Sequence, residues 1–347
     1  MKSICDDLTA DAAIWPPTTE GGRTAVGIRE KKLEAVPTKT ITMRLTGIQY
    51  LAHETNLYEF EPIAGEAIPA AGPGAHIDIH LPNGMIRPYS LVHSGTENRY
   101  TIGVKRDAAG RGGSACLHDM VKVGSVLTVG VPRNNFPLVE TAEHTVLIAG
   151  GIGITPIWCM AERLKELGRS FELHYACRDR RDVAFLEKLE KLSEARIHID
   201  AEVGNFLDLG AIIDQAPASS HLYCCGPAPM LDAFEAKTRD LDPGHVHLER
   251  FAPVEEVSRE GGFVVMLEKS GREFSIPEGK SILEVLRDAG LDVDFSCEQG
   301  ICGACQVQVV DGEPDHRDMF LSDEEKAEGG MMICCSGSRT PRLTLAL

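Results

Sequence analysis

Three closely spaced cysteines near the carboxyl end of the chain constrain its fold more than any other feature. Cys297, Cys302 and Cys305 have the spacing C-x4-C-x2-C. Cys334 follows after 28 intervening residues, and Cys335 comes directly after it. This spacing is typical of plant-type [2Fe–2S] clusters, in which four thiolates hold two irons.

The residues between these cysteines also suit a cluster loop. Gly300 and Gly303 allow the backbone to curl tightly, and the small Ala304 leaves room for amide N–H groups to point at sulfur. Zinc is the main alternative for clustered cysteines, but its sites usually use paired C-x2–4-C units. Four structural thiols would not require a loop with glycines at these positions. We therefore predict a [2Fe–2S] site.

Length and composition favour a soluble protein of several domains. A chain of 347 residues is too long for one ordinary core, and 43% hydrophobic with 25% charged residues is typical of globular proteins. The sequence has no apolar run long enough to span a membrane and no signal-peptide pattern at its start. Eleven cysteines without a mark of export favour a reducing cytoplasm.

Charge excludes one class of partner and suggests another. The net charge of −17 argues against binding the phosphate backbone of nucleic acids. Acidic side chains are dense after the cysteine loop. They are Asp311, Glu313, Asp315, Asp318, Asp323, Glu324, Glu325 and Glu328, against Arg317 and Lys326. Two interpretations stay open: a solvated loop, or a surface that docks a basic patch on an electron-transfer partner.

The first part of the chain reads as an extension followed by a β domain. Residues 1–39 show no sustained hydrophobic period, and we expect an N-terminal extension that is partly disordered. Residues 40–140 contain short β-type runs separated by turn residues, which predicts an antiparallel β-barrel. The expected strands are 42–45, 76–81, 99–104 and 125–129, with a short helix at 117–121.

The second part changes character twice. In 141–251 strands alternate with helices, which predicts a parallel α/β sheet. Its expected strands are 144–149, 171–175, 196–201 and 221–224. We expect a linker at 252–261 and a third domain at 262–347. That domain should hold a hairpin of 263–268 and 272–276, then a helix at 281–289 between an N-cap at Ser281 and a stop at Gly290.

Two stretches of the predicted barrel carry residues suited to a flavin. One is the run Arg87-Pro88-Tyr89-Ser90, and the other runs from Lys105-Arg106 to the glycine-rich turn around Gly113. A glycine turn that opens a helix presents backbone N–H groups to a phosphate. An arginine could bind that phosphate through two hydrogen bonds, while Tyr89 packs beside a flat ring.

The α/β domain carries a glycine turn of its own. Residues 150–156, Gly-Gly-Ile-Gly-Ile-Thr-Pro, follow an apolar strand and precede a helix, where glycines allow a pyrophosphate to approach. The spacing is not G-x-G-x-x-G, so the dinucleotide fingerprint is imperfect. Cys225-Gly226-Pro227 ends another strand, which we expect at the same sheet edge. Arg178 would favour a 2′-phosphate and Asp179 a 2′-hydroxyl, so this pair is ambiguous.

Taken in order, these motifs resemble the phthalate dioxygenase reductase family, within the wider ferredoxin-reductase group. The resemblance covers residues 40–347 and includes the matching runs Glu249-Arg250-Phe251 and Asp315-His316-Arg317-Asp318. The chain is also similar to the reductase components of vanillate demethylase and carnitine monooxygenase. The resemblance implies a multidomain fold: a flavin β-barrel, a ferredoxin-reductase-like nucleotide domain, and an α+β plant-type ferredoxin domain of the β-grasp type.

The resemblance also implies cofactors and site residues. FMN is expected, held by Arg87, Tyr89, Ser90, Lys105, Arg111, Gly112, Gly113 and Ser114. NADH is the expected donor, bound through Gly150, Gly151, Gly153, Thr155, Pro156, Arg178, Asp179, Cys225, Gly226 and Pro227. Cys225 should lie near the nicotinamide and Phe251 near the isoalloxazine, and these two are the expected catalytic residues. The expected iron ligands are Cys297, Cys302, Cys305 and Cys334, with Cys335 as the alternative to the last.

These expectations define a path for electrons: NADH to FMN, FMN to the cluster, and the cluster to a separate protein. In the family that protein is a Rieske-type oxygenase that hydroxylates or demethylates an aromatic acid or a small quaternary amine. The same redox chain could instead serve a cytochrome P450 or a di-iron hydroxylase. A non-enzymatic redox sensor or electron carrier is the hypothesis from another class. The cofactors carry the chemistry, so we name no general base.

Overall fold

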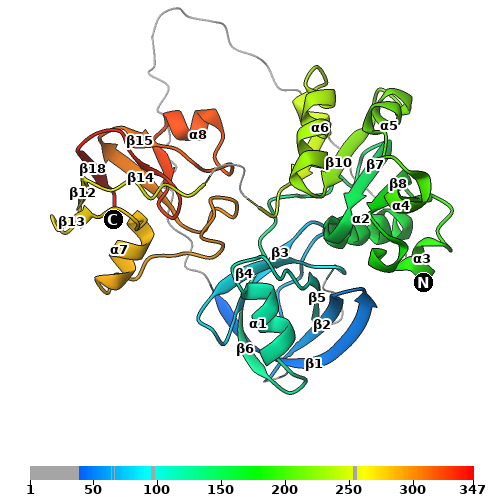
Figure 1. Ribbon diagram of the computed structural model, residues 1–347, viewed down its shortest axis with the longest axis horizontal. Helices are drawn as coiled ribbons and strands as arrows, with labels where there is room; N and C mark the ends of the chain where they lie inside the picture. Colours follow the sequence, from blue (N-terminus) through cyan, green and yellow to red (C-terminus); the bar gives the residue numbers. More distant parts are fainter. Residues whose placement is uncertain (1–38, 64, 66, 95–97, 253–255) are drawn as a thin grey trace, which may run out of the picture. The chain divides into compact units, whose positions relative to one another are not determined.

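The computed structural model describes residues 39–63, 65, 67–94, 98–252 and 256–347. These residues belong to one compact unit. Within it, three groups of elements follow one another along the chain, each built around its own β-sheet (Figure 1).

The first group is the predicted antiparallel sheet. Its six strands have the order β4-β3-β6-β1-β2-β5, and a bridge between Leu91 and Ile102 joins the two edges into a barrel. The elements are β1 (Thr40–Ala52), β2 (Thr55–Pro62), β3 (His76–His80), β4 (Ile86–Ser90), β5 (Tyr100–Lys105), α1 (Gly113–Met120) and β6 (Val126–Gly130). Helix α1 begins four residues before the predicted start at Leu117, because Gly112 turns the chain with a φ of 94°.

The second group is the predicted parallel sheet, with strand order β11-β10-β7-β8-β9. Its strands are β7 (His144–Gly150), β8 (Ser170–Cys177), β9 (Ala195–Ile199), β10 (His221–Cys225) and β11 (Val246–Glu249). Its α-helices are α2 (Ile154–Glu166), α3 (Leu186–Leu189), α4 (Asp200–Val203), α5 (Leu209–Gln215) and α6 (Ala228–Thr238). Three 3₁₀ turns complete it: η1 (Gly151–Gly153), η2 (Arg180–Asp182) and η3 (Pro243–His245).

Burial on both faces explains why the central strand is apolar throughout. Leu147 and Ala149 of β7 pack in the core that contains α2, whereas Val146 and Ile148 pack in the core of α5 and α6. A parallel sheet covered on both sides needs such continuous apolar runs. The predicted strand 196–201 is too long at its end, because Asp200 already begins α4.

The third group surrounds the cysteine loop. Its main sheet has the order β13-β12-β18-β14-β16, and β15 pairs with β17. The elements are β12 (Phe263–Leu267), β13 (Glu273–Ile276), α7 (Ile282–Asp288), β14 (Gln306–Asp311), β15 (Pro314–Asp315), α8 (Asp323–Ala327), β16 (Gly330–Met332), β17 (Gly337–Ser338) and β18 (Arg342–Leu345). The hairpin β12–β13 is confirmed. Ser281 caps α7 as predicted, in a reciprocal capping box with Glu284.

Some predictions fall outside this description. The predicted extension 1–39 lies outside the described residues except for Lys39, and residues 253–255 of the predicted linker do too. The domain boundaries stay predictions. Among the described residues, no helix combines the length and the apolar character that crossing a membrane requires.

Candidate functional site

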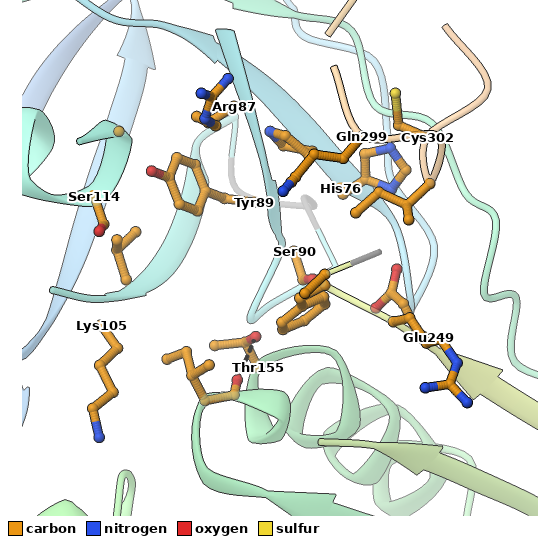
Figure 2. A pocket seen from close by; sticks show the side chains of 18 of the residues that line it. His76, Arg87, Tyr89, Ser90, Lys105, Ser114, Thr155, Glu249, Gln299 and Cys302 are labelled. Carbon is orange, nitrogen blue, oxygen red and sulfur yellow. Dashed lines mark hydrogen bonds between the residues drawn. The ribbon is translucent and has the colours of Figure 1, made fainter. Parts of the chain in front are cut away.

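A cavity of about 620 Å³ brings residues of all three groups together. Figure 2 shows Arg87 and Tyr89 of β4 on one side of it and Thr155 and Glu249 on the other, with Ser90 of β4 between them and Gln299 and Cys302 near His76. The predicted cofactor residues that line it are Arg87, Tyr89, Ser90, Lys105, Arg111, Gly113, Ser114, Thr155 and Phe251. The cavity is therefore the candidate site for a flavin.

One end of the cavity is suited to an anion. None of the described side chains caps the start of α1, so its first N–H groups are available to a ligand. Gly113 lies directly against Arg87, since a Cβ there would come 2.8 Å from Arg87 Cγ. Burial, followed by the nearby Arg87, lowers the pKa of Arg111. Two arginines this close together, next to the first backbone N–H groups of α1, form a site suited to binding a phosphate.

The middle of the cavity is suited to an aromatic ring system. Burial raises the pKa of Tyr89, which keeps the phenol neutral at physiological pH. Phe251 lines the same cavity and is 38% exposed, so one face of its ring remains available. Lys105 also borders the cavity. Its Nζ lies 3.7 Å from Asp182 Oδ1, so this ion pair partly neutralises its charge.

The two predicted nucleotide-binding turns meet at the edge of the parallel sheet. Ala149 pairs with Cys225 in the register of β7 and β10, so both strands end at the same level. A Cβ on Gly153 would lie 2.2 Å from the carbonyl oxygen of Cys225, and one on Gly150 would lie 2.7 Å from Pro227 Cδ. These glycines therefore permit the close contact of the two turns.

The remaining predicted cofactor residues, one from the FMN set and the others from the NADH set, do not line the cavity. They are Gly112, Gly150, Gly151, Gly153, Pro156, Arg178, Asp179, Cys225, Gly226 and Pro227. Cys225 is fully buried, and burial raises the pKa of its thiol. Cys225 is not among the residues that line the cavity, and its backbone carbonyl lies against Gly153.

Arg178 and Asp179 follow β8 at the same sheet edge. Both are exposed, and the carboxylate of Asp179 accepts a hydrogen bond from the N–H of Arg181 at 3.1 Å. Arg180 forms an ion pair with Glu202 at 2.7 Å. Asp179 is thus fixed by its own turn, whereas Arg178 forms no ion pair with the residues that the structure describes.

The sequence did not indicate the role of Glu249 in the cavity wall. Its Oε2 atom is buried and has no hydrogen-bond partner among the described residues. Burial raises the pKa of this carboxyl from 4.5 to about 8. Glu249 pairs with Cys225 in the register of β10 and β11. A signal was present in the sequence, because Glu249 is an isolated acidic residue at the end of a strand, at the sheet edge where ligands bind.

The four predicted iron ligands form two pairs of buried thiols. A hydrogen bond from the Cys302 thiol, with backbone N–H groups of Ile301 and Gln299, lowers the pKa of Cys297. A hydrogen bond to Cys305 raises the pKa of Cys334. Among the described residues, no set of three or more histidine, cysteine or acidic side chains is arranged for a single metal ion. Two pairs of thiols with N–H groups directed at sulfur fit a two-iron cluster.

Cys335 lies outside these two pairs. Its thiol contacts Cys334, Ser336 and the carbonyl oxygen of Met332, the last at 3.7 Å. A Cβ on Gly300 would come 2.5 Å from Cys335 Sγ, so the glycine leaves room for this thiol.

The acidic surface after the cysteine loop is smaller than the sequence suggests. Asp318 is buried, and its Oδ2 accepts a hydrogen bond from the N–H of Leu321 at 3.0 Å. Asp315 forms an ion pair with Arg317 at 2.7 Å. The exposed acidic residues that remain are Asp311, Glu313, Asp323, Glu324, Glu325 and Glu328.

Two family models match the chain. The 2Fe-2S iron-sulfur cluster binding domain matches residues 265–338, and the oxidoreductase NAD-binding domain matches residues 147–208.

Similar whole proteins cover most of the chain. Phenoxybenzoate dioxygenase subunit beta of Ectopseudomonas oleovorans is 49% identical, across 88% of this chain and 97% of that protein. Tetrachlorobenzoquinone reductase of Sphingobium chlorophenolicum is 48% identical, across 89% and 98%.

Two solved structures are also similar to most of this chain. Phthalate dioxygenase reductase, described as a modular structure for electron transfer from pyridine nucleotides to [2Fe–2S], has a TM-score of 0.72 and 39% identity, across 89% of this chain and 98% of that one. An intact type IV self-sufficient cytochrome P450 monooxygenase has a TM-score of 0.77 and 36% identity. It covers 89% of this chain, which matches 41% of that longer one.

Proposed function

This chain belongs to the phthalate dioxygenase reductase family, and we propose that it is the NADH-dependent reductase component of a two-component oxygenase. FMN, NADH and a [2Fe–2S] cluster are its cofactors. The observation that carries the proposal is one cavity lined by the flavin barrel, the nucleotide domain and the cluster loop. The partner we propose is a Rieske-type oxygenase acting on an aromatic acid or a small quaternary amine.

When bound, NADH would supply a hydride, FMN would store the two electrons and the cluster would deliver them singly. The residues of the chain bind and orient them. We propose that Arg87, Arg111 and the first N–H groups of α1 bind the flavin phosphate, because they form the cationic end of the cavity. Tyr89 and Phe251 then contact the ring system, and Ser90 and Lys105 border it.

The nicotinamide end is proposed at the turns after β7 and β10. Gly150, Gly151, Gly153 and Thr155 allow the pyrophosphate to approach the start of α2. The side chain of Cys225 reaches the nicotinamide only if the cavity wall moves, since its thiol is fully buried here. We propose that Asp179 binds the ribose hydroxyls of NADH and thereby favours NADH over NADPH.

The cluster ligands are proposed to be Cys297, Cys302, Cys305 and Cys334. Two observations favour Cys334 over Cys335 as the fourth. Cys334 contacts the Cys305 thiol and lies close enough to Cys297 to affect its pKa. The Cys335 thiol instead contacts Cys334, Ser336 and the carbonyl oxygen of Met332.

A visible absorption spectrum recorded before and after anaerobic NADH tests the proposed electron path. Flavin and iron–sulfur bands should both bleach with NADH. Bleaching of the flavin with no cluster band would contradict the cluster assignment. Negligible oxidation of NADH with an artificial acceptor would instead support the sensor or carrier hypothesis. Reduction by NADPH alone would show that Arg178, rather than Asp179, determines the nucleotide preference.

Two similar proteins suggest other electron acceptors, and both can be tested. One similar chain forms part of a self-sufficient cytochrome P450, and one relative is a tetrachlorobenzoquinone reductase. Reconstitution with a Rieske oxygenase, a P450 domain and a chlorinated quinone in parallel would separate the three acceptors. The proposal requires that cluster-dependent turnover be fastest with the oxygenase.

A further inference from the structure

One residue of the flavin barrel binds the cluster loop through a buried hydrogen bond. Asp78 lies in β3, and Ser296 directly precedes the first predicted iron ligand, 218 residues later in the chain. The Ser296 hydroxyl donates to Asp78 Oδ1 at 2.5 Å. Asp78 is 3% exposed and Ser296 is 1% exposed, so water does not compete for this bond.

Asp78 is itself fixed within the barrel. Its other oxygen, Oδ2, forms an ion pair with Arg133 Nη1 at 2.7 Å. The backbone of Arg133 exchanges two hydrogen bonds with that of His76, at 2.9 and 3.0 Å. The remaining side-chain nitrogens of Arg133 have no hydrogen-bond partner among the described residues, so Asp78 is its anchor there. The acceptor offered to Ser296 therefore has a position set by β3.

A second contact joins the same two parts one residue further on. Arg111 Nη2 donates to the carbonyl oxygen of Cys297 at 2.7 Å. The barrel thus holds two successive residues of the cluster loop, Ser296 by its side chain and Cys297 by its backbone. Cys302, from the same loop, lines the flavin cavity (Figure 2). Any movement of Ser296 away from Asp78 would carry the loop away from the cavity.

We propose that Asp78 and Ser296 are positioning residues that hold the cluster loop against the flavin barrel for the electron transfer between the two cofactors. This inference rests on the proposed function. NADH supplies a hydride, whose two electrons leave singly through the cluster to the acceptor while its proton passes to solvent. No bond to Asp78 or Ser296 forms or breaks in these steps. Neither side chain lines the cavity, so both act through the geometry of the loop.

The test compares three cofactor-loaded variants with the wild-type protein. Ser296→Ala removes the donor. Asp78→Asn keeps an acceptor but removes its charge, and it leaves every residue of the cluster loop unchanged. Ser275→Ala is the matched control, because Ser275 is an exposed residue of strand β13 in the same domain. Two quantities are measured: hydrogen–deuterium exchange of the amides in 294–303 without NADH, and stopped-flow rates of flavin reduction and of cluster reduction.

In Ser296→Ala we expect amide exchange in 294–303 to rise about tenfold, because a hydrogen bond to a charged acceptor stabilises the closed loop by roughly that factor or more. Cluster reduction should slow, whereas flavin reduction by NADH should match wild type. Asp78→Asn should change amide exchange and the rate of cluster reduction in the same directions, but by less. If Ser296→Ala purifies without its cluster, the Asp78→Asn variant tests the proposal. Ser275→Ala should change nothing.

Unchanged exchange and unchanged cluster reduction in both variants would overturn the inference. Faster exchange with cluster reduction at the wild-type rate would overturn it too, because the contact would then be structural only. Failure of the proposed function looks different: the wild-type protein itself would not pass electrons from NADH to its cluster.

Discussion

Glu249 is a carboxyl group whose surroundings keep it protonated. Burial raises its pKa from 4.5 to about 8, and its Oε2 atom has no partner among the described residues. Between these two pH values the native state holds one proton more than the unfolded chain. The free energy of unfolding therefore falls as pH rises from about 4.5 to about 8, by up to about 1.4 kcal/mol per pH unit from this group.

Glu249→Gln should remove that dependence. We expect the variant to match wild type near pH 5 and to become the more stable of the two as pH approaches 8. Chemical denaturation of both proteins across this pH range measures the difference. Glu268→Gln serves as control, because Glu268 is exposed and should leave the pH profile unchanged. Parallel profiles for Glu249→Gln and wild type would show that Glu249 titrates normally.

The doubled cysteine allows a direct test of the fourth ligand. Cys334→Ser should lose the cluster, because Cys334 contacts the Cys305 thiol. Cys335→Ser should keep it, because the Cys335 thiol is directed to Ser336 and the carbonyl oxygen of Met332. Iron content and the visible absorption band after purification measure both results. The reverse pattern, with the cluster retained in Cys334→Ser, would identify Cys335 as the ligand.

At this scale the closeness of the cysteine thiols could be predicted from the sequence, whereas the surroundings of the Glu249 carboxyl could not. Cys297, Cys302 and Cys305 are close in the chain, and the chemistry of iron fixes their spacing, so a local pattern was sufficient. The burial of Glu249 arises from packing of β11 against β10, which no local pattern records. The bond between Ser296 and Asp78 joins residues 218 apart, and such a pairing cannot be predicted from one sequence.

At the scale of elements, the meeting of two turns depends on a glycine. Gly153→Ala would place a Cβ 2.2 Å from the Cys225 carbonyl oxygen, so the turns after β7 and β10 would have to separate. Such overpacking costs about 1–3 kcal/mol. We expect a lower midpoint of thermal unfolding and a higher KM for NADH, with FMN content unchanged. Gly72→Ala is the matched control, because its nearest contact would be at an ordinary 3.7 Å.

Elements with a clear hydrophobic pattern were predicted correctly, whereas the residues at which elements begin and end were predicted less accurately. The apolar run of β7 and the hairpin of β12 and β13 were correct, because burial imposes their patterns directly. Helix α1 begins earlier than predicted, because the glycine turn that starts it carries no hydrophobic period. The end of β9 was misplaced, because the chain enters α4 without a breaker residue.

At the scale of the whole molecule, the candidate flavin site and the candidate cluster site belong to one compact unit of one chain. Electron transfer between them should therefore be intramolecular. We expect the rate constant of cluster reduction, measured after NADH has reduced the flavin, to stay constant across a range of protein concentrations. A rate that rises in proportion to protein concentration would mean that the cluster receives its electrons from another molecule.

The step to the partner should instead depend on concentration and on salt. The net charge of −17 and the exposed acids around α8 should attract a basic patch on an acceptor, and salt screens such attraction over about 10 Å at 0.1 M. We expect the second-order rate of electron transfer to an oxygenase to fall as ionic strength rises. Neutralising Asp323 and Glu324, as Asp323→Asn with Glu324→Gln, should weaken that salt dependence and lower the rate several-fold at low salt.

The matched control neutralises two exposed acids of the nucleotide domain, as Glu187→Gln with Asp240→Asn. It makes the net charge less negative by the same amount, so it separates the local effect of the α8 surface from the effect of total charge. If both double variants lose the same part of the salt dependence, the acceptor responds to total charge and α8 is a solvated segment. If only the α8 variant changes, the partner docks beside the cluster, where the electron leaves the chain.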